Sequence, residues 1–171
     1  MALAFTSGHM GDSVVATQSL GMSMLKLPPP IWALIYLVLA ALVSVAYPWR
    51  QLLDLRSVVI GVVLVIVGLV FSFWAAILFG REGTELNPMS ETNKKLVIRG
   101  PFLITRNPMY VGLVVTSLGI AVIVGSLPMF LVPVLVFATA NWGHIPFEEA
   151  KMRRQFGAAY DSYTGKVRRW L

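Results

Sequence analysis

The feature that most constrains the fold is an uncharged stretch of 34 residues, 110–143. Two shorter uncharged and strongly apolar stretches, 31–47 and 58–79, precede it. A helix needs about 20 apolar residues to cross the hydrocarbon core of a bilayer, within a range of roughly 17–25. The two shorter stretches therefore each predict one transmembrane helix. The longest stretch is too long for one crossing and long enough for two.

Glycine and proline divide the longest stretch near its middle. Gly125 and Pro128 lie there, and these residue types interrupt helices most strongly. We therefore expect helices over 109–124 and 128–142 that form a tight hairpin, with a bend at Pro133 in the second helix. The predicted fold is all-α, a polytopic membrane protein with four transmembrane helices.

The length of 171 residues leaves room for one domain, which we place over 31–171. Residues 1–30 form an N-terminal segment that lacks the pattern of a cleaved signal peptide. Within this segment, 7–10 (SGHM) resemble a cloning scar, so 1–9 are excluded from functional interpretation.

The composition agrees with a membrane protein and excludes several kinds of site. Apolar residues make up 57% of the chain and charged residues 13%, which is far from the balance of a soluble domain. Because there is no cysteine, disulfides, thiolate metal sites and a cysteine nucleophile are excluded. The two histidines lie far apart in the sequence, so we expect no metal centre.

The net charge of +6 is explained by topology rather than by a nucleic-acid partner. Four crossings place 12 of the 14 lysine and arginine residues on one side of the membrane, with Arg50 and Arg56 on the other. Since cytoplasmic loops carry the excess of basic residues, we expect both termini in the cytoplasm and a bacterial inner membrane location. The same basic residues are suited to anionic lipid headgroups.

The C-terminal part, 148–171, is amphipathic rather than apolar. Its apolar side chains recur at the spacing of one helical face, with charged residues on the other faces. We expect an amphipathic helix that lies at the cytoplasmic interface and bends at Gly157. The residues on its apolar face are Met152, Phe156, Ala159, Tyr160, Tyr163 and Val167.

Polar side chains concentrate at the two open ends of the predicted hairpin. One cluster precedes its first helix and the other follows its second helix. Because the hairpin folds back on itself, the two clusters should meet at the cytoplasmic surface. The first cluster contains Arg99, Gly100, Pro101, Phe102, Arg106, Asn107 and Tyr110, and the second contains His144, Pro146, Phe147, Glu148 and Glu149.

Each cluster also has a purely structural interpretation. Asn107 and Pro108 are suited to begin a helix, and Glu148 and Glu149 suit the first turn of a helix that begins near Pro146. The convergence of a guanidinium, an amide, a phenol, an imidazole and two carboxylates favours a binding site instead. Such a site suits a zwitterion that carries a flat heterocycle, and S-adenosylmethionine is one such ligand among others.

Several sequence blocks resemble the isoprenylcysteine carboxyl methyltransferase family, within the wider group that includes the phospholipid N-methyltransferases. The resemblance extends over about 83–171, and the order and spacing of its blocks are more specific than any single block. The blocks are 84–88 (TELNP), 96–102 (LVIRGPF), 106–112 (RNPMYVG), 145–149 (IPFEE), 156–157 (FG), Tyr160, Tyr163 and 167–170 (VRRW).

The resemblance implies a membrane methyltransferase, with 83–171 as the half that binds S-adenosylmethionine in a cytosol-facing pocket. It implies a small lipophilic or prenyl-like substrate that enters sideways between the helices from the membrane lipid. It implies catalytic roles for Arg106, His144 and Glu149. The cofactor contacts that it implies are Gly100, Pro101, Phe102, Arg106, Asn107, Tyr110, Pro146, Glu148 and Glu149.

The sequence departs from the family pattern at two of these positions, and it leaves the acceptor open. Many members have histidine where this chain has Asn107, and some have arginine at the position of His144. A carboxylate acceptor needs no general base at neutral pH, whereas an amine would need one, such as Glu149 or His144. An NADPH-dependent sterol-type membrane reductase and a non-catalytic membrane scaffold are the alternative functions.

Overall fold

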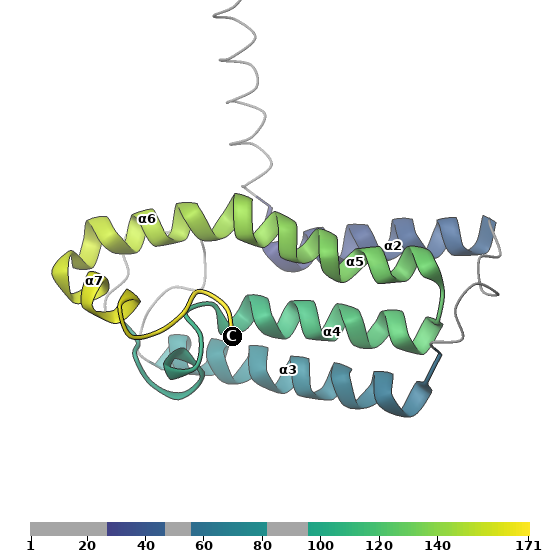
Figure 1. Cartoon of the computed structure of the whole chain (residues 1–171), viewed down its shortest axis with the longest axis horizontal. Helices are drawn as coiled ribbons and strands as arrows, with labels where there is room; N and C mark the ends of the chain where they lie inside the picture. The colour runs from purple at the N-terminus through teal and green to yellow at the C-terminus, as the bar shows by residue number, and fades with distance from the viewer. Residues whose placement is uncertain (1–26, 47–55, 82–95) are drawn as a thin grey trace, which may run out of the picture.

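The computed structural model describes residues 27–46, 56–81 and 96–171. All regular structure within these residues is helical (Figure 1). Block 84–88 of the family resemblance and residues 1–9 lie outside the described part. The helices are α2 (Pro29–Ala46), α3 (Val58–Arg81), η2 (Gly100–Leu103), α4 (Pro108–Val124), α5 (Leu127–Ala138), η3 (Thr139–His144), α6 (Ile145–Phe156) and α7 (Ala158–Thr164).

Three of the described helices are long and apolar enough to cross a membrane. They are Pro29–Ala46, Val58–Arg81 and the continuous helix Leu127–Phe156, which joins α5, η3 and α6. Most of the apolar side chains on α2 and α3 are exposed, as expected of helices that face lipid. The chain is therefore an integral membrane protein. Because α4 has 17 residues and is shorter than these three, the count of four crossings stays a prediction.

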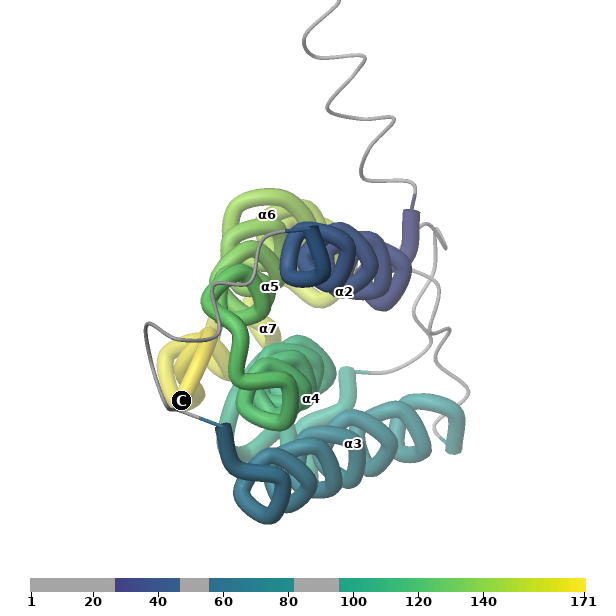
Figure 2. The backbone as a smooth tube through the Cα atoms, turned by 90° about the vertical axis from the view of Figure 1, so that its right-hand side faces the viewer, coloured from purple at the N-terminus to yellow at the C-terminus, as the bar shows by residue number. Residues whose placement is uncertain are grey.

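Helices α3 and α4 pack so closely that their backbones touch. A Cβ atom on Gly68 would lie 2.6 Å from the carbonyl oxygen of Gly112, and one on Gly61 would lie 2.7 Å from that of Gly119. Glycines seven residues apart on each helix therefore face each other, as small residues do at membrane helix contacts. Figure 2 shows α3 against α4, with α2 and α5 on the opposite side of α4.

The connection between α4 and α5 lies where the sequence predicts it. Gly125 has a φ angle of 68°, a left-handed conformation that ends α4, and α5 begins at Leu127. The Nε atom of Arg56 donates to the carbonyl oxygen of Ile123 in the last turn of α4. The hydroxyl groups of Ser126 and Ser44 are 2.6 Å apart and join this turn to α2.

The helix that follows differs from the expected second arm of a hairpin, because it does not end at Trp142. It continues through the π-helix Thr139–His144 directly into α6, so Pro146 lies inside a longer helix. Pro146 has no N–H to donate to the carbonyl of Trp142, and its ring would press on that carbonyl in an ordinary α-helix. The wider turn of a π-helix relieves this conflict. Pro133 lies inside α5, and its expected bend stays a prediction.

The C-terminal part forms two helices rather than one. Helices α6 and α7 are separated at Gly157, which has a φ angle of 49°. Tyr160, Tyr163 and Val167 form a buried cluster with Met152 and other apolar side chains, as their spacing predicts. Two expectations were wrong: Ala159 is exposed, and α7 ends at Thr164, before Val167. The chain then turns back toward the beginning of α4 (Figure 1).

Candidate functional site

A half-enclosed cavity of about 130 Å³ lies where the beginning of α4 meets α6 and α7. Side chains from both predicted polar clusters line it. Asn107 from the first cluster and Glu149 from the second share this cavity, as the sequence argument expected. Its lining residues are Phe79, Leu96, Val97, Phe102, Arg106, Asn107, Pro108, Met109, Tyr110, Glu148, Glu149, Met152, Tyr160 and Tyr163.

The short helix η2 positions the aromatic wall of the cavity. Its first residue, Gly100, has a φ angle of 58°, and a Cβ atom there would lie 2.7 Å from Cδ1 of Leu78 on α3. Glycine therefore permits the close approach of η2 to α3. Phe102 is buried against the ring of Phe79, with ring centroids 5.1 Å apart. The hydroxyl of Tyr163 donates to the carbonyl oxygen of Phe102 at 2.7 Å, which ties η2 to α7.

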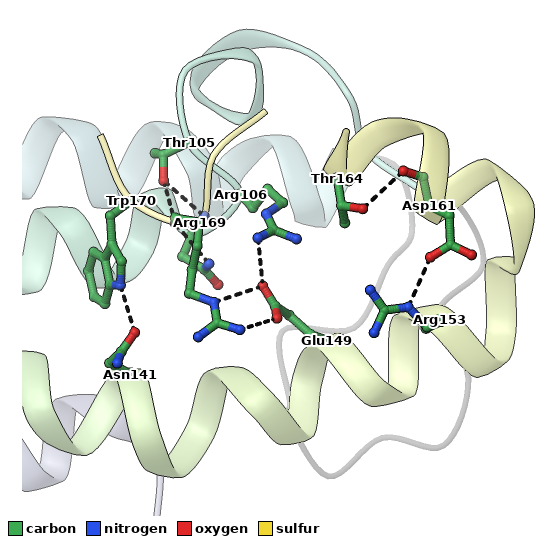
Figure 3. Close-up of polar contacts among 10 residues, drawn as sticks. Thr105, Arg106, Asn141, Glu149, Arg153, Asp161, Thr164, Arg169 and Trp170 are labelled. Atoms are coloured by element: carbon green, nitrogen blue, oxygen red, sulfur yellow. Dashed lines mark hydrogen bonds and ion pairs between the residues drawn. The ribbon is translucent and has the colours of Figure 1, made fainter. Parts of the chain in front are cut away.

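Glu149 is a nearly buried carboxylate held between two arginines (Figure 3). The Nη2 atom of Arg106 lies 3.3 Å from Oε1 of Glu149. Arg169 binds both carboxylate oxygens, through Nε at 3.2 Å and Nη2 at 2.6 Å. The Glu149 side chain is only 11% exposed, so a partner of opposite charge is needed to offset its desolvation.

Glu148 has a different partner although it is the neighbour of Glu149. Its Oε1 atom accepts a hydrogen bond of 2.6 Å from the hydroxyl of Tyr110. This bond joins the first turn of α4 to the first turn of α6. The two carboxylates of the second cluster are thus attached to two different parts of the first cluster.

Asn107 occupies the N-cap position of α4, but its side chain makes no capping hydrogen bond. Its Nδ2 atom donates instead to the carbonyl oxygen of Arg169 at 3.0 Å. Asn107 and Pro108 therefore begin the helix, as the sequence indicated, although the Asn107 side chain does not cap it. The amide serves a long-range contact at the cavity.

Tyr160 and Tyr163 of α7 close one side of the cavity. Burial raises the pKa of Tyr160, and the nearby carboxylate of Glu149 raises it further. Burial also raises the pKa of Tyr163. Both phenols therefore stay neutral at physiological pH, and their rings offer the cavity aromatic surface.

Four of the predicted site residues lie outside this cavity lining. Gly100 and Pro101 belong to η2 and support Phe102, and the side chain of Pro146 is exposed. His144 is buried and lines a separate, much smaller cavity with residues of α2, including Trp32. Its Nε2 atom has no hydrogen-bond partner within the described part of the chain. Tyr110 lines both cavities, and its ring stacks on that of His144 with centroids 6.3 Å apart.

Sequence reasoning missed Arg169, whose side chain and backbone both contact predicted site residues. Arg169 lies in the block 167–170 that carries part of the family resemblance, and this was the available indication. Nothing local in the sequence distinguishes Arg169 from Arg168, because the difference arises only when the C-terminus folds back onto Glu149.

Comparisons with known protein sequences identify the family to which the chain is similar. The sequence model of the phospholipid methyltransferase family matches residues 56–159. A probable protein-S-isoprenylcysteine O-methyltransferase of Oryza sativa subsp. indica is 31% identical over 113 residues, which cover 63% of this chain and 57% of the relative. Protein-S-isoprenylcysteine O-methyltransferase B of Arabidopsis thaliana is 30% identical over 112 residues, which cover 63% and 55%. The chain thus matches a little over half the length of these curated relatives. No solved structure matches.

Proposed function

Because the chain belongs to the phospholipid methyltransferase family, we propose that it is an integral membrane methyltransferase that uses S-adenosylmethionine. We propose a small lipophilic or prenyl-like acceptor, consistent with the names of the curated relatives. The observation that carries the proposal is the convergence of Arg106, Asn107, Glu148 and Glu149 on one cavity.

The residues present fit such a cofactor by the chemistry of their side chains. Carboxylates suit the sulfonium and the ammonium group, a guanidinium suits the carboxylate, and aromatic rings suit the adenine. The Nε atom of Arg106 is buried without a hydrogen-bond partner within the described residues, which leaves a donor for a ligand. A ligand pocket usually has roughly 300 Å³ or more, so part of the cofactor would extend through the open side.

The proposed roles of the chain's own residues are binding, orientation and exclusion of water. The bound cofactor supplies an electrophilic methyl group on a sulfonium. Arg106 and Asn107 would hold the amino-acid end of the cofactor, Glu148 and Glu149 would face its positive charges, and the aromatic wall would hold the adenine. Because an in-line displacement depends on alignment, most of the rate enhancement would come from holding the methyl donor and the acceptor in line with each other and away from water.

We propose that the acceptor reaches this site from the bilayer, with the cavity and both termini on the cytoplasmic side. The exposed apolar surfaces of α2 and α3 place lipid around the protein. His144 keeps its proposed catalytic role on the acceptor side. We place His144 on the acceptor side because it lines the smaller cavity, and Tyr110 lines both this cavity and the cofactor cavity.

Calorimetric titration of the purified chain with S-adenosylhomocysteine tests the proposal. We expect saturable binding by the wild type, and we expect Glu149→Gln to weaken it at least roughly tenfold by removing a nearly buried charge. Asp161→Asn is the matched control, because Asp161 is exposed and pairs with Arg153 away from the cavity lining. Absence of saturable binding by the folded wild type would contradict the proposal, and binding of NADPH instead would favour the reductase alternative.

A further inference from the structure

Residues near the C-terminus form a strap that contacts two residues of the cavity lining. This C-terminal strap, defined here as Arg168, Arg169 and Trp170, lies between the beginning of α4 and the continuous helix of α5, η3 and α6 (Figure 3). It hydrogen-bonds to both Asn107 and Glu149.

The backbone of the strap is fixed to the beginning of α4. The backbone N–H of Arg106 donates to the carbonyl oxygen of Arg168 at 2.9 Å. The carbonyl oxygen of Arg169 accepts from the Thr105 hydroxyl at 2.9 Å and from Nδ2 of Asn107 at 3.0 Å. The Thr105 hydroxyl oxygen in turn accepts from the backbone N–H of Asn107 at 3.2 Å.

The side chains of the strap are fixed to the facing helix. Arg169 forms its two hydrogen bonds with the Glu149 carboxylate. Trp170 donates from Nε1 to Oδ1 of Asn141 at 2.9 Å, and its ring packs on Phe137 with centroids 4.6 Å apart. Arg169 is therefore placed between the two clusters and orients a residue of each.

The contact with Asn107 also fixes the polarity of its amide. A backbone carbonyl only accepts hydrogen bonds, so the atom that faces Arg169 must be the amide nitrogen. The amide of Asn107 can then offer its oxygen, an acceptor, to a ligand in the cavity that it lines. Such an oxygen suits an N–H donor, which the amino-acid end and the adenine of the cofactor both carry.

We propose that Arg169 is a positioning residue for cofactor binding. It holds the Glu149 carboxylate with its guanidinium and the Asn107 amide with its backbone carbonyl. This inference rests on the proposed function and extends it, because it adds Arg169 to the residues that shape the cofactor site.

The decisive variant is Arg169→Met, which keeps the length and apolar stem of the side chain and removes its charge. Arg168→Met is the matched control, because the Arg168 side chain is exposed and its only described hydrogen bond uses its backbone carbonyl. Both variants are titrated with S-adenosylhomocysteine as full-length purified chains, and thermal unfolding reports whether they fold. We expect Arg169→Met to weaken binding roughly tenfold to a hundredfold and Arg168→Met to leave it within about twofold.

Two further measurements separate positioning from general support of the fold. With an acceptor that turns over, Arg169→Met should raise the KM for S-adenosylmethionine while kcat is largely retained. In a Glu149→Gln background, Arg169→Met should have a much smaller effect on binding, because the two residues act through one contact. If Arg169→Met fails to fold, Arg169→Lys replaces it; it keeps the charge, cannot bridge both oxygens, and should bind measurably more weakly than wild type.

Equal or tighter binding by a folded Arg169 variant would overturn the positioning role while leaving the proposed function intact. Tighter binding would show that Arg169 competes with the cofactor for Glu149. Absence of binding by the folded wild type would overturn both proposals together, so the two failures are distinguishable.

Discussion

Glu148 and Glu149 are adjacent in sequence, yet the fold gives them separate partners. Successive residues of a helix point about 100° apart. As a result, Glu148 meets Tyr110 on α4, whereas Glu149 meets Arg106 and Arg169. One carboxylate is bound by a neutral phenol and the other by two cations. The pair is therefore better understood as two distinct binding groups than as one acidic patch.

Removal of the Tyr110 hydroxyl tests the contribution of the neutral partner. Tyr110→Phe leaves Glu148 without its donor, and removing one partner of a buried hydrogen bond costs about 1–3 kcal/mol. We expect S-adenosylhomocysteine to bind roughly tenfold more weakly. Tyr36→Phe is the control, because Tyr36 bonds only the neutral Thr139 hydroxyl and lines neither cavity. Equal effects of the two variants in calorimetry would contradict a specific role for Tyr110.

The residues of the cavity were predictable where they are close in sequence to a helix end. Arg106, Asn107 and Tyr110 are grouped within five positions, as are Glu148 and Glu149, and the structure brings both groups to one cavity. The contacts of the C-terminal strap with Asn107 and Glu149 were not predictable, since they depend on the turn that follows α7. The exposure of Pro146 also escaped prediction, because the π-helix before it sets which face of α6 points inward.

At the scale of elements, the close contact of α3 with α4 positions the helices that carry the site. Gly68 faces the backbone of Gly112 near the beginning of α4, a few residues from Tyr110 and Asn107. A side chain at Gly68 would push the helices apart, and the Phe79 and Phe102 pair that joins α3 to η2 lies at the same end. The glycine contact therefore supports the aromatic wall of the cavity.

Alanine substitution along α3 tests this packing. At Gly68 a Cβ atom would lie 2.5 Å from Oγ1 of Thr116 and 2.6 Å from the carbonyl oxygen of Gly112, so Gly68→Ala should destabilise by about 1–3 kcal/mol. Gly80→Ala is the matched control on the same helix, because nothing lies within 4 Å of its Cβ position. Its higher helix propensity predicts no loss, and a gain of up to about 1 kcal/mol. Equal thermal unfolding midpoints for the two variants would contradict the close contact.

The uncharged stretches predicted the helices well and their ends less well. The beginning of α4 and the break at Gly125 agree with the structure, because proline and left-handed glycine act locally. The predicted end of the last apolar helix at Trp142 does not agree with the structure. The helix continues past Pro146, because one wider π-helical turn accommodates the proline. A similar difference separates the single predicted C-terminal helix from the pair α6 and α7, where Gly157 ends one helix rather than bending it.

On the scale of the whole molecule, the two ends of the helices have different characters. One end carries the turn between α4 and α5, held by Arg56 and the Ser44–Ser126 contact. The other end carries the cavity, the strap and the cluster of α7. Figure 1 shows these features at opposite ends of α4. A lipid-facing body with one polar end is the arrangement that a cofactor from water and an acceptor from the bilayer require.

Photochemical labelling with radioactive S-adenosylmethionine tests the central claim, that this polar end is a cofactor site, most directly. The full chain is irradiated with the labelled cofactor, digested, and its labelled peptides are identified. We expect label in peptides from 96–110 and 148–163, and we expect excess S-adenosylhomocysteine to abolish it. Label confined to 120–131, around the turn between α4 and α5 at the other end of the helices, or label that the competitor does not displace, would contradict the claim.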